Sequence, residues 1–309
     1  MTLFLLIIAP PLLWSAVNYI DKFLLSRTSH HQHFSIDVLM LYSTAFSIVV
    51  LPLSFLFIGE AGIFSNQSQV AIQFIGGLLL TLSIYFYLKA LNEEETSAVI
   101  PLALLAPVFG YILSYLLLGE ILSLRQILAC LIIIFGALIL SLEINEGRRL
   151  RFKHGALGYM ALCTFFQAGQ ETLFKFATIG NSFAVSIFWT HVGILAFGLA
   201  IAFFKRGALR EFFISIKTSG KTVFGVNISS EALSSVAYII RDYTILLAPV
   251  AIVMTFNAFQ PVFVFLLGIL LSIFAPNFIK EKTTRRHLIH KGTATAVMVL
   301  GAVMIYQTF

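Results

Sequence analysis

Long, uninterrupted apolar runs are the feature of this sequence that most limits its fold. The run Gln126–Leu142 is almost entirely apolar and would be apolar on every face of a helix. Transmembrane β-strands instead alternate polar and apolar residues. Only 11% of the 309 residues are charged, whereas a soluble domain carries about 25%. We therefore predict an all-α integral membrane protein of about ten transmembrane helices, at roughly 20 apolar residues for each span.

Hydropathy places these spans along the whole chain. No connection between them is long enough for a folded soluble domain, so any activity must lie within or between the helices. The expected spans are Leu3–Leu25, Ile36–Phe57, Val70–Leu91, Ser97–Leu118, Leu124–Leu142, Gly155–Thr178, Phe183–Phe204, Thr222–Leu246, Pro249–Phe274 and Gly292–Tyr306.

Lysine and arginine residues gather on one side of the predicted membrane. The loops after spans one, five, seven and nine hold most of them, and the opposite side carries only Arg125. Basic loops stay in the cytoplasm, so we predict that both termini face outward. The basic loop residues are Arg27, Arg148, Arg149, Arg151, Lys153, Lys205, Arg206, Arg210, Lys217, Lys221, Lys280, Lys282, Arg285, Arg286 and Lys291.

This distribution also explains the net charge of +6. Cationic loops beside a bilayer set topology and attract anionic lipid. The lipid bilayer is therefore an expected partner and nucleic acid is not. We expect the protein in the bacterial inner (plasma) membrane.

The two halves of the chain share short patterns at a nearly constant offset. At a shift of 154 residues, the triplet Pro107–Phe109 falls on Pro261–Phe263. This predicts two five-helix repeats, residues 1–147 and 148–309. Because each half holds an odd number of helices, the second must be inverted in the membrane, an architecture common in secondary transporters.

Four stretches of the first half carry a family resemblance: Ala90–Val99, Leu105–Gly110, Leu117–Ser123 and Gly136–Leu140. Together they are similar to the EamA repeat of the drug/metabolite transporter superfamily, including its Pro-Val-Phe and Gly-Glu motifs. The resemblance implies a ten-helix transporter with spans five and ten at its periphery, and it leaves a homodimer open. It leaves the substrate undefined, since relatives carry amino acids, nucleotide sugars, sugar phosphates, choline and drugs.

The second half keeps less of this pattern. It retains Pro261–Phe263 and the stretch Gly301–Ile305, but its Gly-Glu position reads Ile273-Phe274. Glu281 lies in the following loop, and the sequence leaves open whether it replaces the missing acid.

Span six carries the polar residues Gln167, Glu171 and Lys175 at a four-residue spacing. This spacing places them on one helix face. A charge at the bilayer centre costs about 2.5–3.5 kcal/mol, so such residues are paired, near a helix end, or functional. The stripe is either an ion pair within the helix, with Lys175 reaching outward, or the lining of a water-filled cavity.

Span eight carries a second stripe, Glu231, Ser235, Tyr238 and Asp242. We predict that it faces a cavity, because four polar groups would be costly against lipid. Arg241 is offset from Asp242 by about 100° around the helix, so the two need not pair. Glu231 has no charged residue one turn away on its own helix. We therefore hypothesise that it is a proton-coupling site or the counter-charge for a cationic substrate.

Spans one and nine complete the candidate set. Trp14 lies mid-span, where packing and ligand stacking are both open, with packing favoured. Asn18 follows it by one turn, and Lys22 either extends to the interface or acts in function. Asn257 and Gln260 precede Pro261 and add amide groups to span nine.

These patterns favour a secondary transporter for a small polar metabolite such as an amino acid or amine. Proton coupling and exchange are both open as its mode of transport. The sequence lacks metal-ligand clusters and the motifs of hydrolases and nucleotide-binding enzymes. We therefore expect no catalytic residues, no metal and no cofactor. A membrane receptor or scaffold is the alternative, and an intramembrane enzyme is a weaker one.

The topology has a direct test. A cysteine introduced at Arg210 should react with an impermeant thiol reagent only from the cytoplasmic side, because Lys and Arg hold that loop inside. Labelling is measured in intact and permeabilised cells. Reaction from outside intact cells would overturn the predicted orientation.

Overall fold

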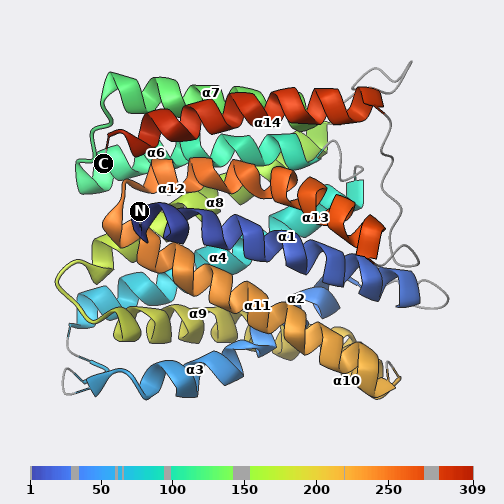
Figure 1. The fold of residues 1–309 in the computed structure, drawn as a ribbon. Coiled ribbons are helices and arrows are strands. Elements are labelled where there is room, and N and C mark those ends of the chain that lie inside the picture. Colours follow the sequence, from blue (N-terminus) through green and yellow to red (C-terminus); the bar gives the residue numbers. More distant parts are fainter. Residues whose placement is uncertain are drawn as a thin grey trace.

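The structure is a computed structural model that describes residues 2–28, 35–59, 62–64, 66–93, 99–141, 154–218, 220–274 and 285–308. Helices make up nearly all of the described part, which contains no β-strand. The all-α prediction is confirmed. The helix α1 begins and α14 ends at the same end of the molecule (Figure 1).

The described helices follow the expected spans, several of which consist of two segments. The first half contains α1 (Thr2–Thr28), α2 (Ile36–Ala45), α3 (Ser47–Phe55), α4 (Gln67–Glu93), the 3-10 helix η2 (Ile100–Leu105), α6 (Ala106–Leu118) and α7 (Leu124–Ser141). The second half contains α8 (His154–Thr178), α9 (Phe183–Phe204), α10 (Arg206–Thr218), α11 (Gly220–Leu247), α12 (Val250–Phe256), the 3-10 helix η3 (Asn257–Phe259), α13 (Gln260–Phe274) and α14 (Arg285–Tyr306).

Six spans of the described chain are long and apolar enough to cross a membrane, and two shorter apolar helices cover 102–118 and 124–140. The six lie in α1, α2–α3, α4, α9, α12–α13 and α14. Helices α8 and α11 have 25 and 28 residues but are not among the six. Both are long enough, and it is their polar stripes that make them less apolar.

One helix lies where the sequence reading placed only a connection. The segment Lys205–Lys221 contains α10, which packs on α2 and α9. Its residues Ala208, Phe212 and Ser215 lie on one face, and the Tyr42 hydroxyl is 2.6 Å from Ser215 Oγ. An amphipathic helix is less apolar than a span, so hydropathy alone missed it.

Both halves break a helix at the same register before the Pro-Val-Phe triplet. The 3-10 helices end at Leu105 and Phe259, and α6 and α13 begin one residue later. Pro107 and Pro261 therefore each occupy the second position of a helix, where a missing backbone N–H costs no intrahelical hydrogen bond.

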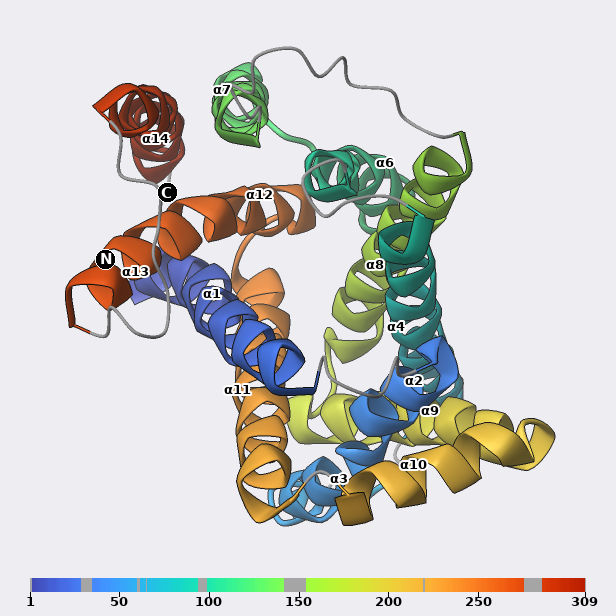
Figure 2. The ribbon, with the colours of Figure 1, turned by 90° about the vertical axis from the view of Figure 1, so that its right-hand side faces the viewer.

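The helices α7 and α14 pack against each other at one edge of the molecule (Figure 2). A Cβ on Gly136 of α7 would overlap Met298 and approach the Ala294 carbonyl, and one on Gly301 of α14 would overlap Ile133 and approach the Ala129 carbonyl. The contact is reciprocal, because the glycine of each helix faces a large apolar side chain and an alanine carbonyl of the other helix.

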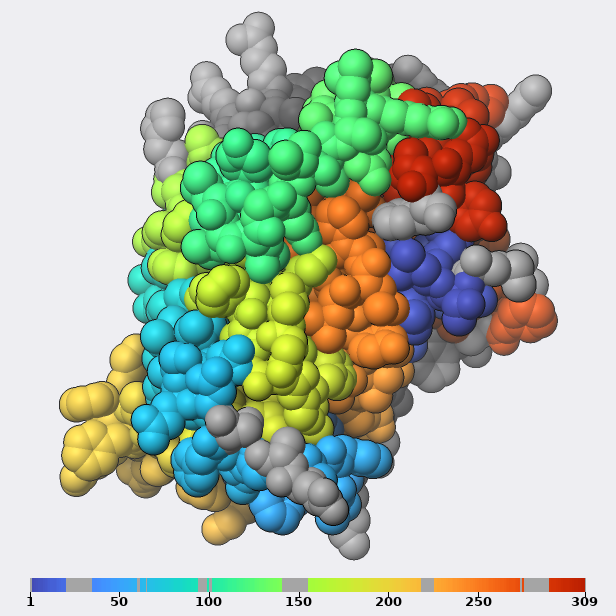
Figure 3. Space-filling model, turned by 90° about the vertical axis from the view of Figure 1, so that its left-hand side faces the viewer, coloured from blue at the N-terminus to red at the C-terminus, as the bar shows by residue number. Residues whose placement is uncertain are grey.

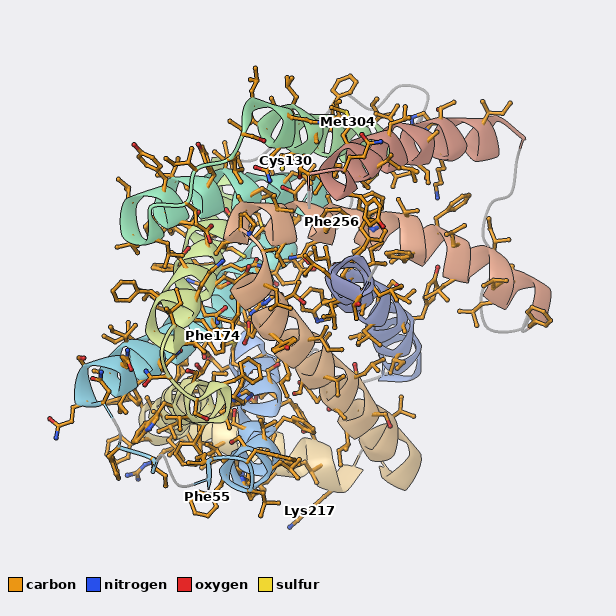
Figure 4. The ribbon with its side chains drawn as sticks, turned by 60° about the vertical axis from the view of Figure 1, so that its left-hand side comes forward. Phe55, Cys130, Phe174, Lys217, Phe256 and Met304 are labelled. Carbon is orange, nitrogen blue, oxygen red and sulfur yellow. The ribbon has the colours of Figure 1, made fainter. Side chains whose placement is uncertain are left out.

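The remaining helices surround the middle of the molecule. In Figure 2, α1 and α11 lie on one side and α4 and α8 on the other. Phe174 and Phe256 are fully buried between helices, whereas Phe55 and Lys217 lie at the outer edge (Figure 4). Tyr19 of α1 donates to the Val264 carbonyl of α13 at 2.6 Å. The polar stripes of α8 and α11 are therefore held inside the helical assembly.

The reciprocal glycine contact predicts a packing defect on substitution. Gly136→Leu and Gly301→Leu should each lower the free energy of unfolding by about 1–3 kcal/mol, because the added side chain meets a packed neighbour. Thermal unfolding in detergent measures the change. Gly158→Leu on α8 is the control, since a Cβ there has no neighbour within 4 Å among the described residues. Equal stability of all three variants would contradict the packing.

Candidate functional site

The candidate site is a buried ionic cluster between α8 and α11. Arg241 is fully buried, and its Nη1 lies 3.1 Å from Oε1 of Glu171 on α8. Its Nη2 lies 2.8 Å from Asp242 Oδ1 and donates to Gln170 Oε1 at 2.9 Å. Three side chains from two helices therefore hold one guanidinium. We call Arg241, Glu171, Asp242 and Gln170 the Arg241 cluster.

Two aromatic rings cover this cluster. Trp14 of α1 and Tyr238 of α11 meet edge to face, with ring centroids 5.1 Å apart. The Arg241 Cζ lies 4.9 Å from the Tyr238 centroid and 6.0 Å from that of Trp14. Aromatic faces attract cations most strongly where water is excluded. The cluster thus links α11 to α1 through aromatic contacts and to α8 through ionic ones.

The charges of the Arg241 cluster do not balance. It contains two carboxyl groups, Glu171 and Asp242, and one guanidinium. Glu171 Oε1 also accepts from Gln167 Nε2 at 3.2 Å. Its other oxygen, Oε2, is buried and has no hydrogen-bond partner among the described residues. Such a group is costly unless it is protonated or meets a further donor.

The structure decides two points that the sequence left open for these residues. Arg241 and Asp242 do pair, because the long arginine side chain reaches back to its neighbour despite their angular offset. Lys175 forms no ion pair with Glu171 in the described structure. It lies 2.6 Å from Glu120 Oε1 and donates to the Ala248 carbonyl at 2.7 Å. The stripe on span six therefore serves two different contacts.

Glu120 belongs to the Gly-Glu motif, and the structure gives the motif a physical role. Gly119 ends α6 with a φ of 66°, a conformation that favours glycine. Glu120 then reaches Lys175 on α8 and accepts from the Val250 N–H at the start of α12, at 3.0 Å. Ser123 and Gln126 form a capping box that starts α7.

The other predicted site residues spread along the same helices. Asn18 is exposed and follows Trp14 by one turn on α1. Glu231 is partly buried, three turns below Asp242 on α11, and accepts a long hydrogen bond from Ser43 of α2 at 3.5 Å. Neither residue touches the Arg241 cluster directly in the contacts described.

Three predicted site residues remain, two at the helix break of the second half and one whose side chain lies outside the described residues. Asn257 begins η3 and Gln260 begins α13, so both lie at the break near α1. The backbone of Lys22 belongs to α1, but its side chain lies outside the described residues.

Sequence reasoning missed two contributors to these contacts. Gln170 lies next to Glu171, but it is off the four-residue stripe and no charge marks it. Glu120 was visible in the motif, but it lies at a helix end far from Lys175 in sequence. Only the tertiary structure brings α6, α8 and α12 together at that point.

The comparisons with known proteins agree with this architecture. Residues 1–142 match the model of the EamA-like transporter family. The first part of the chain is therefore similar to that family over the helices α1 to α7. Trp14, Asn18, Lys22 and Glu120 lie in the matched half, whereas the Arg241 cluster lies beyond it.

Similarity of fold extends further than similarity of sequence. Twenty-six chains of solved structures match. One of them, a crystal structure of a protein, is 16% identical with a TM-score of 0.70, covering 98% of this chain and 96% of that one. At this identity the likeness concerns the fold alone. A comparison with curated proteins finds no match.

The similarity of residues 1–142 to the EamA-like transporter family fits a membrane transporter. This agrees with the expectation of a non-enzyme with a small-molecule substrate in a lipid environment. Among the described residues, no group of three or more His, Cys, Asp and Glu side chains could hold a metal ion.

The Arg241 cluster predicts a strongly asymmetric effect of substitution. Arg241→Met should lower the free energy of unfolding by about 3–5 kcal/mol, because it leaves two buried carboxylates uncompensated. Adding Glu171→Gln and Asp242→Asn should recover most of that loss. Thermal unfolding in detergent measures both. An Arg241→Met variant that is as stable as the parent protein would contradict the ionic arrangement.

Proposed function

We propose that this chain is a secondary transporter that moves a small polar metabolite across the membrane by alternating access. The observation that carries the proposal is the Arg241 cluster, a buried ionic group shared by α8 and α11 and covered by Trp14 of α1. Charges within a membrane are expensive and mark substrate or ion pathways. The match of residues 1–142 to the EamA-like transporter family supports the same class of function.

The substrate belongs to the amino acids, amines or similar polar metabolites. Glu171 offers a buried carboxylate oxygen, and Trp14 and Tyr238 offer ring faces that suit a cationic group. Arg241 is already held by Glu171 and Asp242, so it is a weaker counter-ion for a purely anionic substrate. A zwitterion or amine fits this balance best.

The transport path runs beside the polar faces of α1, α8 and α11, with α4, α6 and α12–α13 completing its wall. Asn18 and Glu231 lie on the same helices as Trp14 and Tyr238, nearer the end that carries α10. Polar residues thus continue from the Arg241 cluster toward that end. Lys22, Asn257 and Gln260 belong to the same proposed path.

The architecture of the transporter is an inverted pair of five-helix repeats, residues 1–147 and 148–309. Two features support it: the helix breaks at Leu105 and Phe259 share one register, and α7 and α14 make the reciprocal contact described above. Such repeats rock against each other around a site near the midplane.

The proposed setting is a bacterial inner membrane with both termini outside. The position of α7 and α14 at one edge suits a homodimer that forms through these two helices. The transported solute and the lipid are the remaining partners.

Counterflow in proteoliposomes tests the function. Vesicles preloaded with one solute should accumulate the labelled form of that solute, with amino acids, choline and other amines tried first and nucleotide sugars next. The triple variant Arg241→Met, Glu171→Gln, Asp242→Asn should be folded and inactive. A triple variant that transports like the parent protein would reduce the cluster to packing.

The substitution Glu231→Gln distinguishes between two roles for the Glu231 carboxylate. If Glu231 couples protons, the variant should lose uptake driven by a pH gradient and keep counterflow. If Glu231 is a counter-charge for the substrate, the variant should lose both, because the cation itself no longer binds. Unchanged rate and pH dependence would contradict both roles.

A further inference from the structure

A second ionic contact lies at the end of the molecule where α1 begins. Glu120 of the first half meets Lys175 of α8 at 2.6 Å and the Val250 N–H at 3.0 Å. Lys175 donates in turn to the Ala248 carbonyl at 2.7 Å. Two side chains thereby connect the end of α6, α8, the end of α11 and the start of α12. Figure 3 shows these chain segments side by side on this face.

The Lys175 amine and the Glu120 carboxylate each also bind a backbone group that has no hydrogen-bond partner within its own helix. The Ala248 carbonyl follows the last turn of α11, where carbonyls lack intrahelical donors, and the Val250 N–H opens α12, where amides lack acceptors. The two side chains are 12% and 14% exposed for Lys175 and Glu120. The pair is therefore mostly shielded from water, so it is stronger than an exposed surface ion pair.

We infer that Glu120 and Lys175 form a latch that closes this end of the transport path and must break for it to open there. The inference rests on the proposed alternating access. Glu120 comes from the first half and its partners all come from the second, so any rocking of the halves that separates α6 from α8 and α12 stretches these contacts. A contact within one half would move as a unit and could not act in this way.

The sequence motif that supplies the acid of the latch occurs in the first half of the chain. At the offset of 154 residues that aligns the Pro-Val-Phe triplets, Gly119-Glu120 falls on Ile273-Phe274. The Gly-Glu motif itself therefore has no counterpart at this register of the second half. A latch at one end biases the proposed transporter toward a state closed at the end where α1 begins.

A reporter cysteine beneath the latch tests this bias without any substrate. Ala168 is fully buried against α6 and α12 and lies two helical turns from Lys175 on the same face of α8. The reporter is Ala168→Cys in a chain whose native Cys130 and Cys163 are replaced by alanine. Its reaction with an impermeant maleimide is followed from the side where α1 begins.

Glu120→Gln keeps an acceptor for the Val250 N–H and removes the charge, and Lys175→Met removes the opposite charge. Each should raise the labelling rate roughly fivefold or more, because each weakens the closed state by one partly buried ion pair. Lys175→Arg should restore slow labelling. Glu120→Gln and Lys175→Met change the net charge in opposite directions, so a general effect of charge would change their labelling rates in opposite directions.

The matched control is Arg125→Gln. Arg125 lies at the same end and donates to Gln307, which joins α7 to α14 at the periphery rather than across the path. Its labelling rate should stay at that of the parent. The latch is wrong if Glu120→Gln and Lys175→Met label like the parent, or if Arg125→Gln labels as fast as they do. If labelling shifts but no solute gives counterflow, the latch stands and the proposed transport function fails.

Discussion

The fold depends on one constraint: a lipid-exposed chain must pair every buried charge and every open backbone group within itself. In the hydrocarbon region no water replaces a missing partner. The Arg241 cluster meets most of this constraint by joining two helices around a single guanidinium, and it leaves one buried oxygen of Glu171 without a hydrogen-bond partner among the described residues. Glu120 and Lys175 meet it at one end by closing open groups of α11 and α12. Polar residues therefore act as the specific contacts of an otherwise apolar assembly.

Apolar packing in this molecule has a different role from that in a soluble protein. Lipid is as apolar as the side chains, so helices associate through close fit and small residues rather than through hydrophobic burial. Gly136 and Gly301 allow α7 and α14 to approach each other on reciprocal sides. For the same reason, the helices that meet at the Arg241 cluster are distinguished from the other helices by their polar stripes and not by their apolar residues.

In the transporter that we propose, the two ionic contacts have different roles, one in binding and one in gating. The Arg241 cluster has an excess acid and aromatic cover, which suits a solute with a positive group. The Glu120–Lys175 pair links the two halves at one end, which suits a contact that opens and closes. Each contact includes a residue of α8, Glu171 in one and Lys175 in the other, so a movement of that helix would affect both contacts. This coupling through one rigid element is the simplest physical route between them.

The sequence by itself determined the class of the protein and most of its helices. Apolar runs of about 20 residues have no other stable arrangement in a membrane than helices, and the motif around Gly119 and Glu120 pointed to the family. It also placed Tyr238 and Asp242 on a stripe expected to face a cavity, and it named Glu171 and Arg241 as candidate site residues. The helix α10 was not predicted, because an amphipathic helix lacks the hydropathy of a span.

Only the tertiary structure decided which charge meets which. Sequence spacing described neighbours on one helix and so suggested Lys175 for Glu171. The contacts instead join residues far apart in the chain, Arg241 with Glu171 and Lys175 with Glu120. Long arginine and lysine side chains reach several partners at similar cost. The packing of α6, α8, α11 and α12 therefore selects among them, and that packing is a property of the assembled helices.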